Sequence, residues 1–178
     1  QESTRLHRMV IQLLEMQDKD QYIRMESLDV AKTLRNVVDS MQMKAKRYDN
    51  ALILEGDEEV FLVRGREDRV RQVLINLIDN AIKYGEAGKE IWIRISRKRN
   101  QVQIAVANQG KGIEVREIKH IFEPFYRVDK ERSREMGSSG LGLSISRKIM
   151  EEHGGAIQVR SEPGGYTIFM VSFPGILD

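Results

Sequence analysis

The stretch that decides the fold is Gly137-Ser-Ser-Gly140-Leu-Gly142-Leu-Ser-Ile-Ser-Arg-Lys-Ile-Met-Glu-Glu-His153-Gly-Gly155. It begins as a glycine-rich loop and continues as a helix, in which Leu141, Ile145 and Ile149 recur at every fourth position. The pair Gly154-Gly155 ends this helix, because glycine adopts positive φ at little cost. A glycine loop that opens into a helix is suited to bind anions, because the first backbone N–H groups lack helical partners. A helix that merely follows a flexible loop is the alternative.

Composition limits the possible classes of protein. The 178 residues suffice for one domain with a hydrophobic core, and 40% apolar with 31% charged residues are ordinary for a globular protein. The net charge of +2 gives no support to nucleic-acid binding, and the absence of cysteine excludes disulfides and thiolate metal sites. No apolar run is long enough to span a membrane. Because the pattern at Gln1 is already helical, we expect a piece of a longer protein.

The chain outside this stretch alternates predicted helices and strands. Helices are expected at residues 1 to about 20, 29–48 and 66–84, and strands at 24–28, 51–54, 60–63, 90–98, 101–107, 156–160 and 166–173. Residues 127–139 have no apolar period, and we expect a mobile lid there.

The first of these helices carries a single apolar stripe. Its members are Leu6, Met9, Val10, Leu13 and Leu14. Such a stripe needs a covering partner, and a second helix in a bundle is favoured over packing against the main domain.

Polar side chains lie beside the apolar face of the helix expected at 66–84. Asn76, Asn80, Lys83 and Tyr84 fall at i, i+4, i+7 and i+8, within a wedge of roughly 100°. Asparagine is a mediocre helix former, so two of them one turn apart favour a binding face. A solvated face with satisfied asparagines is the alternative.

A glycine turn and an aromatic cluster are two further segments of unusual composition. The strand at 101–107 runs into Asn108-Gln-Gly110-Lys-Gly112-Ile113, whose glycines allow the backbone to approach a ligand closely. The segment Ile121-Phe-Glu-Pro-Phe-Tyr-Arg127 carries an aromatic cluster. Taken alone, the first is better explained as an ordinary strand-end turn, and the second as a hydrophobic plug.

In this order, the four segments resemble the motifs of the catalytic, ATP-binding domain of sensor histidine kinases, in the GHKL superfamily. Residues 76–84 are similar to its N box, and residues 108–112 to its first glycine box. Residues 122–127 are similar to its F box, and residues 137–143 to its second glycine box. The resemblance covers about residues 22–174.

The resemblance implies a fold and a division of the chain. The fold is a two-layer α/β sandwich of the Bergerat type, with a mixed sheet covered on one face by helices and a flexible lid over ATP. Residues 1–21 resemble the end of the dimerisation and phosphoacceptor hairpin, and residues 22–178 the catalytic domain. The implied protein is a homodimer anchored in the bacterial cell membrane, with this domain in the cytoplasm and no nucleic acid bound by it.

The implied activity is that of a protein-histidine kinase. It binds Mg-ATP and transfers the γ-phosphate to a histidine on the upstream hairpin, for relay to a response regulator. In the family's acceptor an acidic residue follows the histidine directly, which is true of none of His7, His120 and His153. We therefore expect the acceptor before Gln1, and no self-labelling by this chain.

The family's roles carry over residue by residue. Asn80 is implied to give its side-chain oxygen to Mg²⁺, and Asn76 to support the phosphates and the metal. Lys83 is implied to neutralise phosphate charge, Tyr84 to pack near adenine, and Arg127 to reach the γ-phosphate when the lid closes. Asn76, Lys83 and Arg127 are the implied catalytic residues. The other implied contacts to the nucleotide are Asn108, Gly110, Gly112, Ile113, Phe122, Gly140, Leu141, Gly142 and Leu143, with backbone N–H groups of 140–142 toward the phosphates.

Two positions carry information about the chemistry. The family's first glycine box usually opens with Asp, which accepts a hydrogen bond from adenine; here it opens with Asn108. Its amide still accepts from adenine, so we predict binding weakened by about 1 kcal/mol. Related ATPases resemble this layout but carry a general-base Glu where Asn76 stands, so we predict slow hydrolysis of bound ATP.

Two alternatives remain open at this point. One is a degenerate nucleotide-binding regulatory module without kinase activity, which is suggested by Asn108 at the position where the family usually has Asp. The other is a GHKL serine kinase of the anti-sigma type, against which the apolar stripe of the first helix argues.

Overall fold

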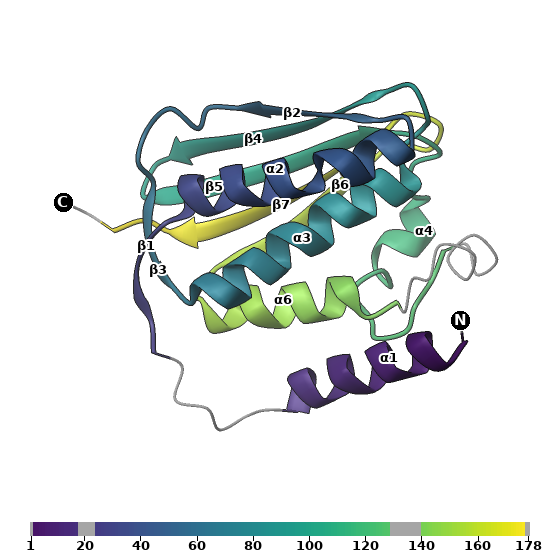
Figure 1. Ribbon diagram of the computed structural model, residues 1–178, viewed down its shortest axis with the longest axis horizontal. Helices are drawn as coiled ribbons and strands as arrows, with labels where there is room; N and C mark the ends of the chain where they lie inside the picture. The colour runs from purple at the N-terminus through teal and green to yellow at the C-terminus, as the bar shows by residue number, and fades with distance from the viewer. Residues whose placement is uncertain (1, 18–23, 129–139, 177–178) are drawn as a thin grey trace.

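The computed structural model describes residues 2–17, 24–128 and 140–176 (Figure 1). A five-stranded mixed sheet forms one layer, in the order β2-β4-β5-β7-β6. Strand β2 runs parallel to β4, and the other neighbouring pairs are antiparallel. The bounds are Ala51–Glu55 for β2, Glu90–Lys98 for β4, Gln101–Gln109 for β5, Ala156–Ser161 for β6 and Tyr166–Pro174 for β7.

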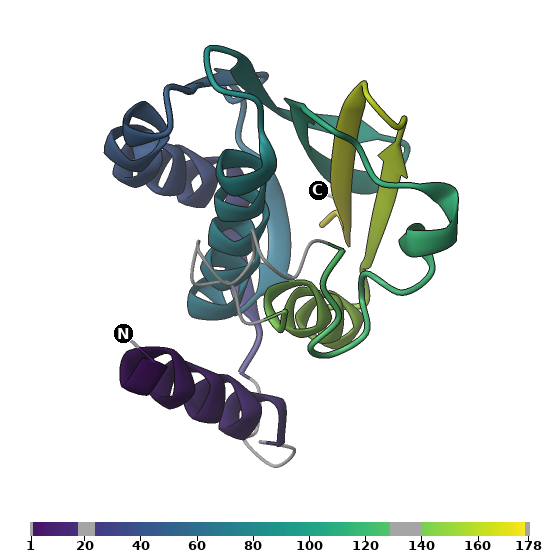
Figure 2. The same cartoon turned by 90° about the vertical axis from the view of Figure 1, so that its right-hand side faces the viewer.

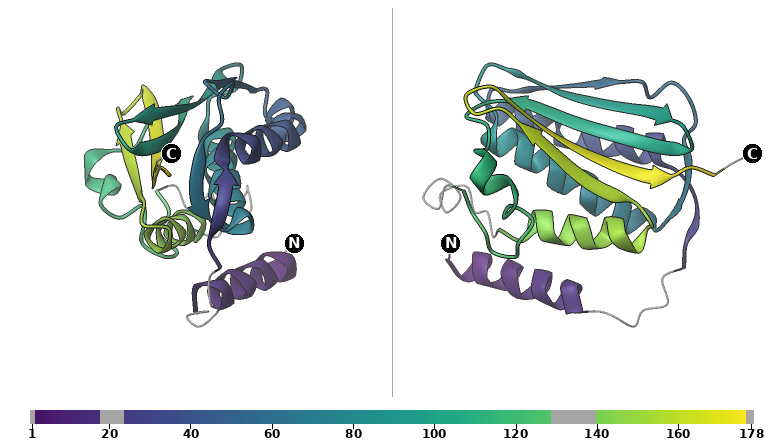
Figure 3. Two further views of the ribbon diagram at one scale, coloured as in Figure 1. Left: turned by 90° about the vertical axis from the view of Figure 1, so that its left-hand side faces the viewer. Right: turned by 180° about the vertical axis from the view of Figure 1, so that it is seen from behind.

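Helices cover one face of this sheet (Figures 1 and 3). They are α2 (Val30–Arg47), α3 (Glu67–Tyr84) and α6 (Gly142–Glu152), and a short helix α4 (Val115–Ile118) follows β5. Alternate residues of β4, β5 and β7 point toward the helices and are buried, because successive side chains of a strand face opposite sides. The expected two-layer sandwich, with a mixed sheet covered on one face, is therefore confirmed.

Helix α3 lies at the centre of the helical layer. Its apolar positions 70, 73, 74, 77, 78 and 81 are buried as the periodicity predicted, and Ile82 is buried as well. It packs against α2 on one side and α6 on the other (Figure 2). This packing fixes the polar wedge of α3 relative to the first turn of α6.

A second, two-stranded sheet was not predicted. Strand β1 (Glu26–Asp29) pairs antiparallel with β3 (Leu62–Gly65), whereas β2 joins the large sheet. Asp29 connects the first turn of α2 to the segment before β3. Its Oδ1 accepts hydrogen bonds from the backbone N–H of Ala31 at 3.2 Å and from that of Phe61 at 3.1 Å. The same carboxylate therefore caps α2 and ties it to the segment before β3.

Helix α1 (Glu2–Gln17) lies beside α6, outside the helical layer (Figure 1). Its apolar stripe does not pack on the main domain: Leu6 is 64% exposed and Leu14 61% exposed. The boundary expected near residue 21 lies outside the described residues, as does most of the expected lid. None of the described helices is long and apolar enough to cross a membrane.

Candidate functional site

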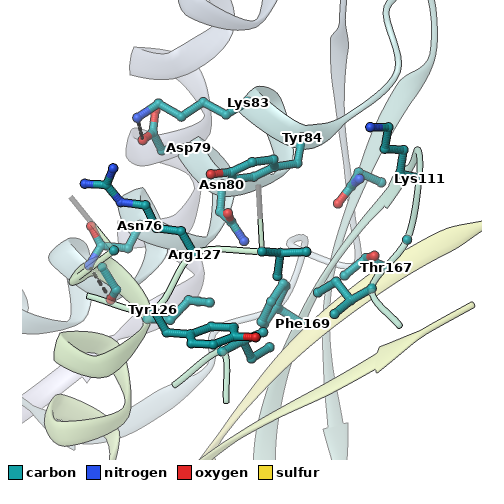
Figure 4. Close-up of a pocket in the computed structure, with 18 of the residues that line it drawn as sticks. Asn76, Asp79, Asn80, Lys83, Tyr84, Lys111, Tyr126, Arg127, Thr167 and Phe169 are labelled. Atoms are coloured by element: carbon teal, nitrogen blue, oxygen red, sulfur yellow. Dashed lines mark hydrogen bonds and ion pairs between the residues drawn. The ribbon is translucent and has the colours of Figure 1, made fainter. Parts of the chain in front are cut away.

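A pocket of about 320 Å³ opens between α3, the ends of β5 and β7 and the first turn of α6 (Figure 4). This volume is at the lower end of the range for small-molecule sites. Most of the residues singled out in the sequence line it. They are Asn76, Asn80, Lys83, Tyr84, Asn108, Gly112, Ile113, Arg127, Gly140, Gly142 and Leu143.

Asn76 joins α3 to α6. Its Nδ2 donates hydrogen bonds to the carbonyl oxygen of Gly142 and to Oγ of Ser146, both at 3.2 Å. Both amide hydrogens are thus used within the protein, and Oδ1 is the group that remains for a ligand. Ser146 is fully buried, so this pair fixes the distance between the two helices beside the pocket.

Asn80 points into the pocket one turn further along α3 (Figure 4). Among the described residues, no protein group forms a hydrogen bond with its side chain. Its amide oxygen is a hard donor of the kind that Mg²⁺ prefers. The part of the chain that the structure describes holds no group of three or more acidic, histidine or cysteine residues that could hold a metal ion. A cation at Asn80 therefore needs most of its ligands from a bound anion and from water.

Lys83 lies in an ion-pair network that the sequence did not predict. Its Nζ lies 3.0 Å from Oδ2 of Asp79 (Figure 4). Oδ1 of Asp79 accepts a hydrogen bond from Lys44 of α2. The Lys83 side chain is only 12% exposed. The network carries a net charge of about +1, so it presents less positive charge to a ligand than two unpaired lysines would.

The glycine turn before α6 closes the pocket from another side. Helix α6 begins at Gly142, and the side chain of its N-cap residue Leu141 makes no capping hydrogen bond. N–H groups of a first helical turn have no partner within the helix, so such a turn can bind an anion. Gly140 has φ +76°, and a Cβ there would lie 2.9 Å from the carbonyl carbon of Phe125. Phe125 in turn donates its N–H to the Gly140 carbonyl at 2.9 Å. Residues 137–139 of the predicted glycine box lie outside the described residues.

The turn after β5 is fixed by the turn between β6 and β7. The N–H of Gly110 donates to the Gly165 carbonyl at 2.9 Å, and that of Gly164 donates to the Lys111 carbonyl. Gly112 has φ +72°, and a Cβ there would lie 2.1 Å from the Glu162 carbonyl oxygen. Glycine is therefore required at position 112 by both conformation and space.

Three residues expected at the nucleotide do not line the pocket. Gly110 packs against the Tyr84 carbonyl, where a Cβ would approach to 2.6 Å. Leu141 is fully buried in the core. Phe122 stacks edge-to-face on Phe169, with ring centroids 6.4 Å apart. These residues support the walls of the pocket from behind.

The structure also adds residues that sequence reasoning missed. They are Arg8, Gln12, Asp79, Lys111, Ile121, Tyr126, Val128, Thr167 and Phe169. The spacing of Asp79 and Lys83 at i, i+4 was a visible signal for an ion pair. Thr167 gave none, because only the strand register sets it beside Asn108. Tyr126 donates a hydrogen bond to Glu117, which raises the pKa of the tyrosine hydroxyl.

Comparison with known proteins gives a consistent set of relatives. The family model described as "Histidine kinase-, DNA gyrase B-, and HSP90-like ATPase" matches residues 65–176. The sensor histidine kinase YkoH of Bacillus subtilis (strain 168) is 36% identical over 174 residues, covering 97% of this chain and 37% of YkoH. The sensor protein kinase WalK of Staphylococcus haemolyticus is 34% identical over 179 residues, covering 98% of this chain and 29% of WalK. The chain thus spans about a third of the length of these relatives.

Solved structures of similar fold come from the same group. The catalytic domain of histidine kinase ThkA superposes with a TM-score of 0.73 at 30% identity, over 84% of this chain and 95% of that domain. Full-length ShkA in complex with AMPPNP gives 0.83 at 25% identity, over 97% of this chain and 36% of ShkA. ThkA in complex with the response regulator TrrA gives 0.80 at 29% identity, over 98% of this chain and 48% of the ThkA chain.

Proposed function

Because the chain belongs to the histidine kinase-, DNA gyrase B- and HSP90-like ATPase family, we propose that it is the ATP-binding kinase domain of a sensor histidine kinase. One observation carries the proposal. Asn80 of α3 and the uncapped first turn of α6 line the same pocket, so a group for a divalent cation and a group for an anion lie together. This is the combination that a metal–triphosphate needs.

In this proposal the nucleotide lies with its base at the β5–β7 end and its phosphates at α6. Asn80 and the phosphates hold Mg²⁺, which supplies charge neutralisation for phosphoryl transfer. Arg127 extends across the pocket toward α3, where it contacts the terminal phosphate (Figure 4). Asn76 has no proton-accepting carboxylate, so the site positions ATP without activating water.

The phosphate acceptor is proposed to be a histidine outside this chain. Within the chain, His153 uses both ring nitrogens: Nε2 accepts from the Arg66 N–H at 3.1 Å, and Nδ1 bonds the Ile149 carbonyl at 2.7 Å. His120 bonds Glu123 at 2.8 Å. The full-length relatives are about three times as long. We place the acceptor on a helical hairpin outside this chain, in a membrane-anchored homodimer. The ThkA–TrrA complex supports a response regulator as the next partner.

A second candidate function has one observation in its favour. Lys83 is paired with Asp79 instead of standing toward the pocket alone, which lowers the charge available to a transferring phosphate. A regulatory module that binds nucleotide without transferring phosphate would have this property. Binding and transfer must therefore be measured separately.

Calorimetry of this chain with Mg-ATP tests the proposal. We expect saturable binding that weakens about tenfold or more in Asn80→Ala. Asn36→Ala, an exposed asparagine of α2, is the matched control and should bind within about twofold of wild type. No binding at millimolar nucleotide would refute the proposal. Binding without transfer of label from γ-labelled ATP in the full-length protein would favour the regulatory module.

A further inference from the structure

Two buried polar side chains from neighbouring strands form one end of the pocket. The register of β5 and β7 sets Asn108 opposite Thr167. Both line the pocket, although Asn108 is 7% and Thr167 5% exposed. Their polar atoms therefore have little access to water other than through the pocket itself.

The Asn108 side chain has no hydrogen-bond partner in the part of the chain that the structure describes. Neither its Oδ1 nor its Nδ2 is among the fully enclosed unpaired atoms of the described residues, so both atoms are open to the pocket that the residue lines. Polar groups at such largely buried positions are normally satisfied by a partner. The carbonyl oxygen and the NH₂ group of Asn108 are thus both left for a bound molecule. The amide differs from a carboxylate at this place because it presents a donor as well as an acceptor.

The Thr167 hydroxyl can act either as a hydrogen-bond donor or as an acceptor toward the pocket. Its Oγ1 lies 2.7 Å from Oγ of Ser161, and either hydroxyl can be the donor. Ser161 accepts the N–H of Ile113 at 2.7 Å, and its own hydrogen has a second acceptor, the Tyr166 carbonyl, at 3.2 Å. When Ser161 donates to Tyr166, Thr167 donates to Ser161 and turns its lone pairs to the pocket. When Ser161 donates to Thr167, the Thr167 hydrogen is free to point inward.

We propose that Asn108 and Thr167 read the base of the nucleotide without a fixed polarity, so that the pocket accepts 6-oxo purine nucleoside triphosphates about as well as ATP. This inference rests on the proposed function and names its substrate class. Adenine offers a donor at its 6-amino group and an acceptor at N1. Hypoxanthine offers the reverse, an acceptor at O6 and a donor at N1. A half-turn of the Asn108 amide exchanges its oxygen and nitrogen and matches either edge.

Space around the amide permits both orientations. Gly85 and Gly110 flank it, and even a Cβ built on them would lie 3.7 Å from its Cβ and 3.6 Å from its Nδ2. The two orientations have the same shape and differ only in which atom donates. A carboxylate at position 108 has no donor in any orientation, so it discriminates against O6.

The test compares ITP with ATP, both with Mg²⁺, by calorimetry. ITP differs from ATP only at the positions that Asn108 and Thr167 are proposed to read. For the wild-type chain we expect a ratio of dissociation constants, ITP over ATP, within about threefold. For Asn108→Asp we expect the ratio to rise to about tenfold or more, chiefly because ITP binds less tightly. Asn100→Asp adds the same charge at the other end of β5 and should keep the wild-type ratio.

Each outcome decides the proposal. A wild-type ratio of about tenfold or more in favour of ATP overturns it, as does a ratio that Asn108→Asp leaves unchanged. In both cases ATP still binds, and the proposed function stands. Failure of the wild-type chain to bind either nucleotide overturns the proposed function, and this inference with it.

Discussion

The imidazole Nε2 of His153 accepts a hydrogen bond from the backbone N–H of Arg66, at 3.1 Å and 87 positions away in the chain. The other ring nitrogen bonds the Ile149 carbonyl at 2.7 Å. His153 follows the last residue of α6, and Arg66 precedes the first residue of α3. One buried ring therefore satisfies a helix end on each side and joins the two helices that line the pocket.

Replacing His153 with Ala should destabilise the fold. The change leaves the Arg66 N–H without its acceptor and opens a cavity beside Gly65, whose Cβ would lie 3.0 Å from the ring. We expect a loss of about 2–4 kcal/mol in the free energy of unfolding, measured by urea denaturation. His7→Ala on the exposed face of α1 is the control, expected within about 0.5 kcal/mol of wild type. Equal midpoints for the two variants would contradict this role.

Two glycines with the same φ separate backbone strain from crowding. Gly112 and Gly164 both have φ +72°. A Cβ added at Gly112 would lie 2.1 Å from the Glu162 carbonyl oxygen, whereas a Cβ added at Gly164 would have no neighbouring atom within 4 Å. Gly164→Ala should cost about 1 kcal/mol from strain alone. Gly112→Ala should cost about 3 kcal/mol and also weaken Mg-ATP binding, because the turn beside Asn108 must move. Similar losses in both would show that the close approach is absent in solution.

The Asp79 carboxylate should oppose nucleotide binding while it supports the fold. Asp79 lines the pocket and pairs with Lys83 and Lys44. We expect Asp79→Asn to tighten Mg-ATP binding about fivefold at low salt, with the gain shrinking as salt rises, and to lower the unfolding free energy by about 1 kcal/mol. Lys83→Ala should weaken binding. Asp39→Asn, exposed on α2, is the matched control; weaker binding in Asp79→Asn would contradict the assignment.

Asn76→Glu should increase ATP hydrolysis. A carboxylate at this position can take a proton from water, which the amide cannot, and general bases contribute about 100-fold or more when well placed. Because Glu lacks the hydrogens that Asn76 donates to Gly142 and Ser146, we expect a rise of only about tenfold, with reduced stability. Asn76→Gln is the control, because glutamine has the same side-chain length as glutamate but no carboxylate to act as a base. This variant should hydrolyse ATP at the wild-type rate. An unchanged rate in the Glu variant would argue against a site that excludes water activation.

Acid should weaken the start of α3. Burial raises the pKa of Asp68, but the Arg66 guanidinium, bonded to both carboxylate oxygens at 3.1 and 2.8 Å, outweighs this and holds the pKa below its usual value. A depressed folded-state pKa adds stability above the unfolded-state pKa, and that stability is lost as pH falls through the folded-state value. Urea unfolding from pH 5 downward should show the difference between wild type and Asp68→Asn shrinking with acid. A constant difference would contradict the pairing.

The sequence predicted the four long helices and the strands of the large sheet because these depend on local signals, whereas the short helix α4 was not predicted. The mixed sheet and most of the pocket residues were expected from the family resemblance. The periodic apolar positions of α3 and the alternation in β4 and β5 report burial directly. The pairing of β1 with β3 was missed, since neither four-residue strand has a pattern that names its partner. For the same reason β2 and β3 were not assigned to different sheets.

The missed site residues share a physical cause. Thr167 and Phe169 occupy buried positions of β7 that alternate in the same way as its core positions. Only the register between β5 and β7 shows that these two residues line the pocket instead of the core. The pairing of Lys83 with Asp79 was visible as an i, i+4 spacing, but the third member, Lys44, comes from another helix. Asn76 was expected to support phosphates, and the structure adds a tie to α6 that no local pattern signals. The individual roles at the nucleotide remain predictions.

Helix α1 contributes two residues to the lining of the pocket. Arg8 and Gln12 lie one turn apart and line the pocket, while Leu6, Val10 and Leu14 on the same helix are exposed. Because a helix advances about 100° per residue, a rotation of α1 equal to two residues would turn Arg8 and Gln12 away from the pocket together. A rotation of α1 would therefore change the lining of the pocket directly, because two residues of this helix belong to that lining.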